Sequence, residues 1–427
     1  MRKLRYSFSA LALGVVLLAA CGQKPDEPAT PTDIPQVTEA PKATVTPEPT
    51  KAPTPTPAPT PTPMGTNLPE GVNLLNTYGE TFGRIGVCIN QYKLTDADAL
   101  KQISENYNSI TMENEMKPDA ILGSGKKQLT IDEAKALGYV IPENYKEETV
   151  PELNFYFTDR ALEFCAKNNL GLRGHTLVWH SQTPSWFFRE GYRSDGAFVT
   201  PDVMDARMEF YIRSVMGHIY DNENGYVLYA WDVVNEYVHA TESGWSEVYG
   251  DMGLEPSFVK LAFEIADDVL RQYGIEEEVS LFYNDFNTYM DTLQIQNLLK
   301  FINSDEWICD GVGMQSHLKA GSPSAVIFLL TVQKFLDDGY EVQLTELDVG
   351  NSNDITQATY LYELMSGLLE KKQNGGNITG ITYWGLSDVN SWRPGEKALL
   401  FKTVKTPKLS YYKVLEAYVD AGLYVEK

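Results

Sequence analysis

Two hydrophobic patterns alternate from about residue 68 to the end of the chain. Short apolar runs rich in β-branched and aromatic residues, typical of buried strands, are each followed by a stretch with the amphipathic period of a helix. Because the runs are apolar almost throughout, they favour a parallel sheet covered on both faces. The predicted strands begin at Arg84 (RIGVCI), Ser109 (SITMEN), Leu170 (LGLRGHTLVW), Leu228 (LYAWDVVNE), Val279 (VSLFYND), Asp310 (DGVGMQSH), Glu341 (EVQLTELDV) and Ile378 (ITGITYWGLS).

Eight strand and helix units predict an α/β fold, the (β/α)8 TIM barrel, in a single domain over residues 67–427. A doubly wound open sheet is the alternative. Helix starts are also readable: Thr200 and Ser322 each precede a proline, the pattern of a capping hydroxyl before a proline in the first turn. In a barrel, polar residues at the carboxyl ends of the strands form the functional face.

The segment before the barrel has the pattern of an exported protein. Basic residues open the chain, and an apolar run from Phe8 to Ala20, too short to span a bilayer comfortably, ends in small residues. Residues 1–20 are therefore predicted to be a signal peptide. The sequence LAACG around Cys21 resembles a bacterial lipobox, in which cleavage leaves an acylated cysteine at the new N-terminus. We expect an extracytoplasmic protein, lipid-anchored to the cell surface through Cys21, with free secretion and an incidental cysteine as the alternative.

Residues 21–66 are almost entirely Pro, Thr, Ala and scattered charges, including the run TPTPAPTPTP. Such a composition cannot form a core, and it predicts a disordered, partly polyproline linker. At about 3.1 Å per residue the linker would reach on the order of 140 Å at most, enough to hold a tethered domain away from a membrane. A tail without a spacing role is the alternative.

Charge and cysteine content narrow the classes of partner. The formal net charge of −23 disfavours nucleic acid and anionic membrane surfaces, and it fits an uncharged substrate. We expect a monomer that meets a membrane only through Cys21. The other cysteines, Cys88, Cys165 and Cys309, form no CxxC pair, so neither a disulfide framework nor structural zinc is predicted. His175 and His180 would face opposite sides of an extended strand, which disfavours a metal pair, and no cofactor is expected.

Polar groups gather where the predicted strands end, and two of them are Glu236 and Glu346, on the fourth and seventh strands. Two facing carboxylates about 5 to 5.5 Å apart are what retaining glycoside hydrolysis needs. Like-charge repulsion at that spacing is about 3 kcal/mol, so one carboxyl should stay protonated near neutral pH. Asp232 shares the face of Glu236 and is interpreted as a hydrogen-bonded supporting group.

Six motifs carry a family resemblance, in the family's order, from about residue 74 to 419. The chain resembles family 10 glycoside hydrolases, the endo-β-1,4-xylanases. The motifs are ENEMK from Glu113, RGHTLVWHSQTPSW from Arg173, WDVVNE ending at Glu236, GMQSH from Gly313, LTELDV containing Glu346, and YWGLSDVNSW from Tyr383.

The resemblance implies a retaining endo-1,4-β-xylanase that hydrolyses internal bonds of xylan by double displacement, with Glu236 as acid/base and Glu346 as nucleophile. It implies that Asn235 binds the sugar 2-hydroxyl, that His317 hydrogen-bonds Glu346, and that Asp348 fixes the imidazole. Strand alternation supports part of this, since Glu346 and Asp348 share a face, as do Gln315 and His317. The implied substrate-binding residues, on the glycone side, are Glu113, Asn114, Lys117, His175, Trp179, Gln182 and Gln315, with Trp384 and Trp392 as stacking walls.

Several residues also have a simpler interpretation or depart from the family pattern. Trp179, Trp384 and Trp392 are alternatively core aromatics, and Lys117 a solvated charge. Pro118 stands where the family commonly has Trp, and Lys402 where an acid is frequent. Residues 119–154 form an insertion that the family pattern lacks. The insertion has no apolar period and is interpreted as an excursion at the glycone end of the cleft.

Two other functions fit parts of the sequence. A retaining barrel glycosidase acting on β-glucan or mannan shares the paired carboxylates. A solute-binding lipoprotein of a sugar importer shares the lipobox, the linker and the α/β domain, but it has two lobes and no need for paired glutamates. No second, sugar-binding module is expected.

Overall fold

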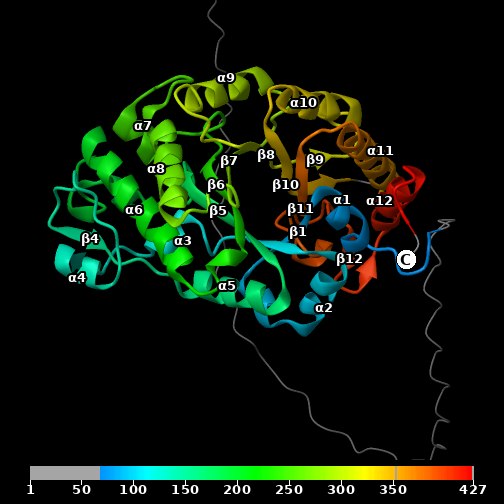
Figure 1. Ribbon diagram of the computed structural model, residues 1–427, viewed down its shortest axis with the longest axis horizontal. Helices are drawn as coiled ribbons and strands as arrows, with labels where there is room; N and C mark the ends of the chain where they lie inside the picture. Colours follow the sequence, from blue (N-terminus) through cyan, green and yellow to red (C-terminus); the bar gives the residue numbers. More distant parts are fainter. Residues whose placement is uncertain (1–67, 352, 426–427) are drawn as a thin grey trace, which may run out of the picture. The chain divides into compact units, whose positions relative to one another are not determined.

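The computed structural model describes residues 68–351 and 353–425. Its centre is a closed barrel of parallel strands, because each strand pairs with the next and β11 pairs with both β10 and β1 (Figure 1). The predicted TIM barrel is thereby confirmed, and the open sheet is wrong. In barrel order the strands are β1 (Arg84–Ile89), β2 (Ser109–Met112), β5 (Gly171–Trp179), β6 (Leu228–Asn235), β7 (Ser280–Asp285), β8 (Gly311–Met314), β10 (Glu341–Gly350) and β11 (Ile378–Tyr383).

Helices surround the barrel (Figure 1). In α8 the buried residues Val259, Phe263, Ala266 and Leu270 recur at helical spacing. The longer helices are α2 (Ala97–Asn106), α5 (Tyr156–Asn168), α6 (Pro201–Asp221), α8 (Ser257–Tyr273), α9 (Thr292–Ile302), α10 (Ala325–Asp337), α11 (Asp354–Gln373) and α12 (Leu409–Asp420). Shorter elements are α1 (Glu80–Phe82), α7 (Gly244–Tyr249), β9 (His317–Lys319), β12 (Phe401–Thr403) and β13 (Thr406–Pro407).

The two predicted helix starts have different outcomes. Thr200 occupies the expected N-cap position of α6, directly before Pro201, but its hydroxyl does not cap a helix amide and donates to the Asp202 carboxylate instead. The prediction for Ser322 is wrong, because α10 begins at Ala325 and its cap is Ser324, whose hydroxyl accepts a hydrogen bond from the amide of Ile327. Pro323 therefore does not mark the first turn of α10, because Ser324, two residues after Ser322, caps the helix instead.

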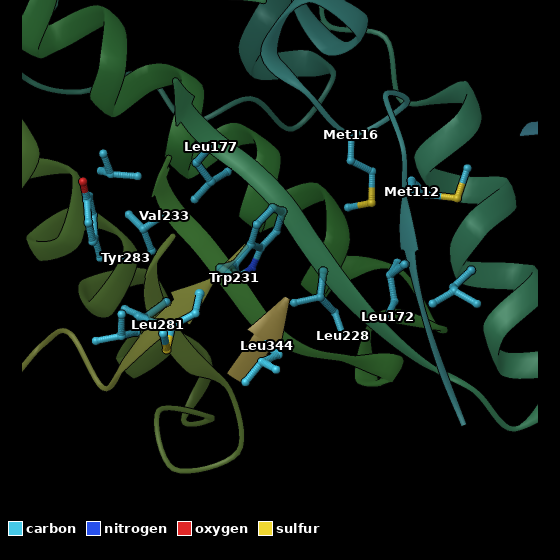
Figure 2. Packing of buried hydrophobic residues seen from close by; sticks show 14 of the residues in the cluster. Met112, Met116, Leu172, Leu177, Leu228, Trp231, Val233, Leu281, Tyr283 and Leu344 are labelled. Atoms are coloured by element: carbon cyan, nitrogen blue, oxygen red, sulfur yellow. The ribbon is translucent and has the colours of Figure 1, made fainter. Parts of the chain in front are cut away.

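Alternate residues of the strands face the helices or the barrel interior. Arg173 on β5 reaches Gln343 on β10, across the barrel, so these polar side chains fill its interior. On the neighbouring strand β6, Trp231 packs among buried apolar side chains (Figure 2). It faces outward, because its indole N–H donates to the hydroxyl of Tyr220 on α6. A Cβ at Gly174 would lie 2.3 Å from the Trp231 ring, so only glycine fits beside it.

The 119–154 segment folds as a small layer of its own, although its sequence shows no apolar repeat. It contains the end of α3 (Pro118–Leu122), then β3 (Gln128–Thr130), α4 (Ile131–Ala136) and β4 (Thr149–Pro151), with β3 antiparallel to β4. Arg207 of α6 donates two hydrogen bonds to Glu147 and so ties the segment to the barrel helices. The apolar side chains that it buries are too few to give a period.

The predicted signal peptide, Cys21 and the 21–66 linker lie outside the described residues. Among the residues that are described, none of the helices combines the length and hydropathy needed to cross a bilayer.

Candidate active site

A cavity of about 600 Å³ lies at the carboxyl ends of the strands. Except for Asp348, every residue that the sequence singled out for catalysis or substrate binding lines it, so the structure brings together motifs from six separate strand ends. The lining residues are Glu113, Asn114, Lys117, His175, Trp179, Gln182, Asn235, Glu236, Gln315, His317, Glu346, Trp384 and Trp392, together with Phe286, Asn287 and Arg393.

Glu236 follows directly after β6 and is held by three side-chain donors. Its Oε2 accepts from Trp179 Nε1 at 2.7 Å and lies 3.1 Å from His180 Nε2, and its Oε1 accepts from Gln315 Nε2 at 2.6 Å. Burial raises the pKa of Glu236, but these hydrogen bonds outweigh burial and lower the pKa below its usual value. The expectation that like-charge repulsion keeps one carboxyl protonated near neutral pH is therefore wrong for Glu236, because three donors stabilise its ionised form.

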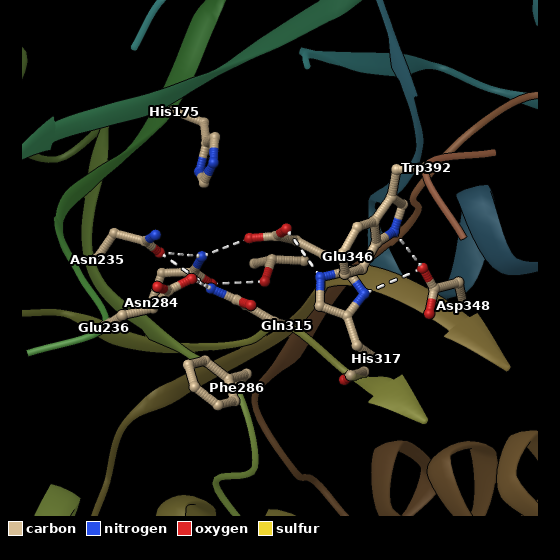
Figure 3. A network of polar contacts seen from close by, with 12 residues as sticks. His175, Asn235, Glu236, Asn284, Phe286, Gln315, His317, Glu346, Asp348 and Trp392 are labelled. Atoms are coloured by element: carbon tan, nitrogen blue, oxygen red, sulfur yellow. Dashed lines mark hydrogen bonds and ion pairs between the residues drawn. The ribbon is translucent and has the colours of Figure 1, made fainter. Parts of the chain in front are cut away.

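Glu346 lies within β10 and is held by an amide and an imidazole. Its Oε1 accepts from Asn284 Nδ2 at 2.8 Å, and its Oε2 lies 3.2 Å from His317 Nε2 (Figure 3). The other imidazole nitrogen, Nδ1, lies 3.0 Å from Asp348 Oδ2, so the expected Glu346–His317–Asp348 contacts are present. Burial lowers the pKa of His317, but hydrogen bonds to both carboxylates outweigh burial and raise the pKa to about 9. The imidazole is therefore a cation that faces both acids.

A continuous chain of amides joins the two glutamates. Asn235 Oδ1 accepts from Asn284 Nδ2 at 2.8 Å and from Gln315 Nε2 at 3.2 Å, and those same nitrogens donate to Glu346 and Glu236 respectively (Figure 3). Asn284 is on β7 and Gln315 follows β8, the two strands between β6 and β10. The intervening strands thus fix the position of one carboxylate relative to the other.

The predicted sugar-binding residues on the β2 and β5 ends are also connected. Lys117 is buried, its Nζ donates to Gln182 Oε1 at 3.1 Å, and it lies 4.8 Å from the centre of the Trp179 ring. The interpretation of Lys117 as a solvated charge is wrong, because its ammonium is enclosed by the cleft. Gln182 also donates to Asn114, and Asn90 donates to Glu113, each at 3.3 Å.

The two histidines of β5 and its following loop both belong to this region. His175 Nδ1 lies 2.9 Å from Asp232, which also pairs with Arg173 in the barrel interior. His180 contacts Glu236 but does not line this cavity, whereas His175 does, so the two imidazoles have different surroundings. The register of β5 against β6 shifts between His175 and Val178, which interrupts the alternation of an ideal strand.

The three tryptophans differ in exposure. Trp384 is 6% exposed and makes edge contacts with His175 and His317, while Trp392 is 51% exposed and donates its indole N–H to Asp348. Trp179 donates to Glu236. All three line the cavity, so none is only a core aromatic.

Backbone strain marks the same strand ends. Gln182, Glu236, Asn287 and Ser316 have φ angles of 43°, 61°, 46° and 65°, a region that non-glycine residues rarely adopt. Such conformations cost on the order of 1–3 kcal/mol each, and they persist where the surrounding contacts hold them. Here Gln182, Glu236 and Asn287 themselves line the cavity, and Ser316 directly precedes His317, which also lines it.

Sequence reasoning missed five residues of the site. His180 and Asn284 stand within motifs at the strand ends, so their position near the cleft was readable, although their contacts were not. Phe286, Asn287 and Arg393 carry no pattern of their own; Arg393 pairs with Asp348 from a long loop. Within residues 68–351 and 353–425, no group of three or more His, Cys, Asp or Glu residues is placed to hold a metal ion, and the cysteines there are unpaired and buried.

Known proteins are similar to this chain over the barrel. The model of glycosyl hydrolase family 10 matches residues 73–417. Endo-1,4-β-xylanase A of Butyrivibrio fibrisolvens is 46% identical over 348 residues, which cover 81% of this chain and 85% of that protein. A bifunctional endo-1,4-β-xylanase of Ruminococcus flavefaciens is 36% identical, over 78% of this chain and 33% of that protein.

Solved structures agree with these sequence matches. The CBM22 and GH10 modules of a Clostridium thermocellum endo-1,4-β-D-xylanase, complexed with xylohexaose, align with a TM-score of 0.67 at 31% identity, over 80% of this chain and 67% of that one. An endo-1,4-β-xylanase from Caldicellulosiruptor owensensis aligns with a TM-score of 0.65 at 28% identity, over 80% and 99%. The chain belongs to glycosyl hydrolase family 10.

Proposed function

We propose that the protein is a retaining endo-1,4-β-xylanase that cuts internal bonds of xylan. The observation that carries the proposal is the amide chain from Glu236 through Gln315, Asn235 and Asn284 to Glu346, which holds two carboxylates against one cavity. A site that only bound sugar would gain nothing from two buried, oriented carboxylates, because each costs free energy to bury.

In the first step Glu346 attacks the anomeric carbon while Glu236 gives its proton to the departing glycosidic oxygen. A glycosyl ester on Glu346 and a shortened chain with a free hydroxyl result. In the second step Glu236 takes a proton from water, whose oxygen displaces Glu346 at the anomeric carbon. Two inversions give net retention. Asn235, adjacent to Glu236, is placed to bind the sugar 2-hydroxyl, a contact that strengthens as the ring flattens.

Substrate binding should raise the pKa of Glu236, which its three donors lower. A bound chain excludes water from the cavity, and desolvation raises the pKa of a carboxylate, which favours the protonated acid. Esterification of Glu346 then removes a negative charge from the opposite side of the cavity, so Glu236 becomes easier to ionise and acts as the base.

The choice of xylan is supported by the relatives, which are named endo-1,4-β-xylanases. One solved relative was complexed with xylohexaose and another with xylotriose. The cavity of this chain also suits an uncharged polymer, because amides and aromatic rings dominate its walls apart from the paired charges.

Reducing sugar released from xylan, carboxymethylcellulose and mannan, measured side by side, tests the substrate. We expect xylan to be preferred; a preference for either other polymer would support a different barrel glycosidase. Glu346→Ala should lose several orders of magnitude of turnover and still bind xylo-oligosaccharides. A wild-type protein that binds these sugars without cleaving them would support the solute-binding lipoprotein. Full activity of Glu236→Gln on xylan would remove the acid/base assignment.

We also propose that the enzyme is a monomer anchored outside the cytoplasm through acylated Cys21, with residues 21–66 as the spacer. The lipobox-like sequence and the Pro/Thr composition support this proposal. Growth with radiolabelled palmitate should label the wild type, whereas Cys21→Ser should be unlabelled and released to the medium. Label-free wild-type protein in the medium would indicate simple secretion.

A further inference from the structure

His239 lies in the loop after β6, three residues past Glu236, and bridges two carboxylates of another loop. Its Nδ1 is 2.9 Å from Asp285 Oδ1, and its Nε2 is 3.0 Å from Asp291 Oδ2. Asp285 ends β7 and is fully buried, while Asp291 directly precedes α9. Both ring nitrogens face carboxylate oxygens, an arrangement that suits a cationic imidazole with a hydrogen on each nitrogen.

The electrostatics agree with this protonation state. Hydrogen bonding to Asp285 raises the pKa of His239, and Asp291 adds to the effect against the opposing effect of burial. Asp285 is itself fixed by donors other than His239, because the hydroxyl of Tyr283 and the amide of Phe286 both donate to it. The bridge therefore rests on a rigid support at the end of a barrel strand.

The ring of His239 also contacts Phe286, with centroids 4.4 Å apart and planes tilted by 34°. Phe286 and its neighbour Asn287 line the same cavity as Glu236 and Glu346, next to the polar network of Figure 3. Phe286 thus has one face against a fixed cation and lies at the wall of the cleft, the arrangement of a ring that stacks on a sugar.

Barrel order indicates which part of the substrate meets Phe286. The strands run β1, β2, β5, β6, β7 around the barrel, so β7 lies across the mouth from β1 and β2. Glu113 follows β2 and belongs to the proposed glycone side. Phe286, across the two catalytic carboxylates from Glu113, faces the sugar on the leaving side of the scissile bond.

We infer that His239 is a positioning residue that fixes Phe286 through the Asp285 and Asp291 bridge, and thereby sets how strongly the enzyme holds the aglycone sugar of a xylan chain. The inference rests on the proposed xylanase function. His239 touches neither proposed catalytic carboxylate, so its effect should depend on whether the aglycone side is occupied.

Two substrates separate that effect from general damage. Xylopentaose places sugars on both sides of the cleaved bond. The leaving group of 2,4-dinitrophenyl β-xylobioside departs without help from an acid. Hydrolysis of the glycosyl-enzyme then limits kcat, and the aglycone side is empty during that step. For His239→Asn we expect kcat/KM on xylopentaose to fall about ten-fold further than kcat on the aryl substrate, the scale of one lost aromatic contact.

His218→Asn is the matched control. His218 on α6 also bonds an aspartate, Asp159, at 2.7 Å and stacks on a phenylalanine, Phe155, at 3.8 Å, but it is not part of the cavity. It should change the two rates by the same factor. Asp291→Asn, which removes one charge of the bridge but retains an acceptor, should give a smaller effect than His239→Asn in the same direction.

A double variant tests whether the effect passes through Phe286. If His239→Asn and Phe286→Ala together cost no more on xylopentaose than Phe286→Ala alone, the two residues act as a unit. Additive losses, or equal losses on both substrates, would overturn the inference. Equal losses would mean that His239 acts through Glu236, whose neighbour His180 contacts Thr241 in the same loop. Failure of the wild type to cleave xylan would instead overturn the proposed function.

Discussion

His180 holds Glu236 from the side opposite Gln315. Its Nδ1 accepts from the Thr241 amide at 3.3 Å, so its Nε2 carries the hydrogen and donates to Glu236 Oε2 at 3.1 Å. Among the hydrogen bonds that lower the pKa of Glu236, this one contributes most. The imidazole therefore stabilises the ionised form of the proposed acid.

Replacing His180 should extend activity to higher pH. The basic limb of kcat/KM reports ionisation of the acid in the free enzyme, and loss of a donor to the carboxylate raises its pKa. In His180→Asn we expect the basic limb of the xylan profile to move upward, and in His218→Asn to stay in place. A limb that stays unchanged or moves downward in His180→Asn would contradict this account.

His317 should make stability depend on pH in the alkaline range. Burial lowers its pKa, but hydrogen bonds to Asp348 and Glu346 outweigh burial and raise it to about 9, against about 6.5 in an unfolded chain. The folded state thus binds the proton more tightly, so the stabilisation is complete below pH 6.5 and is lost as pH rises through 9. It amounts to about 3 kcal/mol at most.

Urea unfolding at pH 6 and pH 10 measures that contribution. The free energy of unfolding of the wild type should fall more between the two pH values than that of His317→Asn, which lacks the proton. Equal decreases in the two proteins would show that other groups cause the change.

The fold and the main site residues were readable because both leave local signals. An apolar run that ends in a carboxylate, as at Glu236 and Glu346, is visible in a few residues of sequence, and the barrel then brings such ends together. The contacts of His180 were not readable, because strand alternation fails where β5 shifts register before Trp179. The pKa of Glu236 depends on donors at the ends of two other strands, β5 and β8, which no local pattern contains.

The structure of the 119–154 segment could not be predicted from the sequence either. Its strands β3 and β4 are three residues each, too short to give a recognisable period, and the Arg207–Glu147 pair joins positions 60 residues apart. Its stability comes from contacts with α6 that only the tertiary structure defines. The composition of the segment predicted only a loop, whereas in the structure its tertiary contacts hold short strands and a helix in place.

The buried pair of Arg173 and Asp232 should contribute strongly to stability. Arg173 donates to both oxygens of Asp232, and both side chains are at most 1% exposed. Asp232→Asn would leave a buried guanidinium without its counter-charge, so we expect a loss of about 3–5 kcal/mol in the free energy of unfolding. Guanidinium unfolding measures it; Asp195→Asn, which removes the exposed pair with Arg193, should change little. Similar losses in both variants would contradict the buried-charge explanation.

Tyr92 should matter only for long substrates. It is 75% exposed and lines a hollow of about 420 Å³ that shares Glu113, Asn114 and Gln182 with the main cavity. The insertion completes this hollow through Asp119, which accepts a bond from Gln182. An exposed ring beside amides suits a xylose unit distant from the cleaved bond.

We therefore expect Tyr92→Ala to lower kcat/KM on xylohexaose by up to about ten-fold and to leave xylotriose nearly unchanged, because one stacking contact is lost only when a distal sugar is present. Tyr226→Ala is the control: Tyr226 is 77% exposed but precedes β6, at the opposite end of the barrel from the cleft. If kcat/KM fell by the same factor on both oligosaccharides, Tyr92 would not contact the substrate. The binding cleft would then end at Glu113.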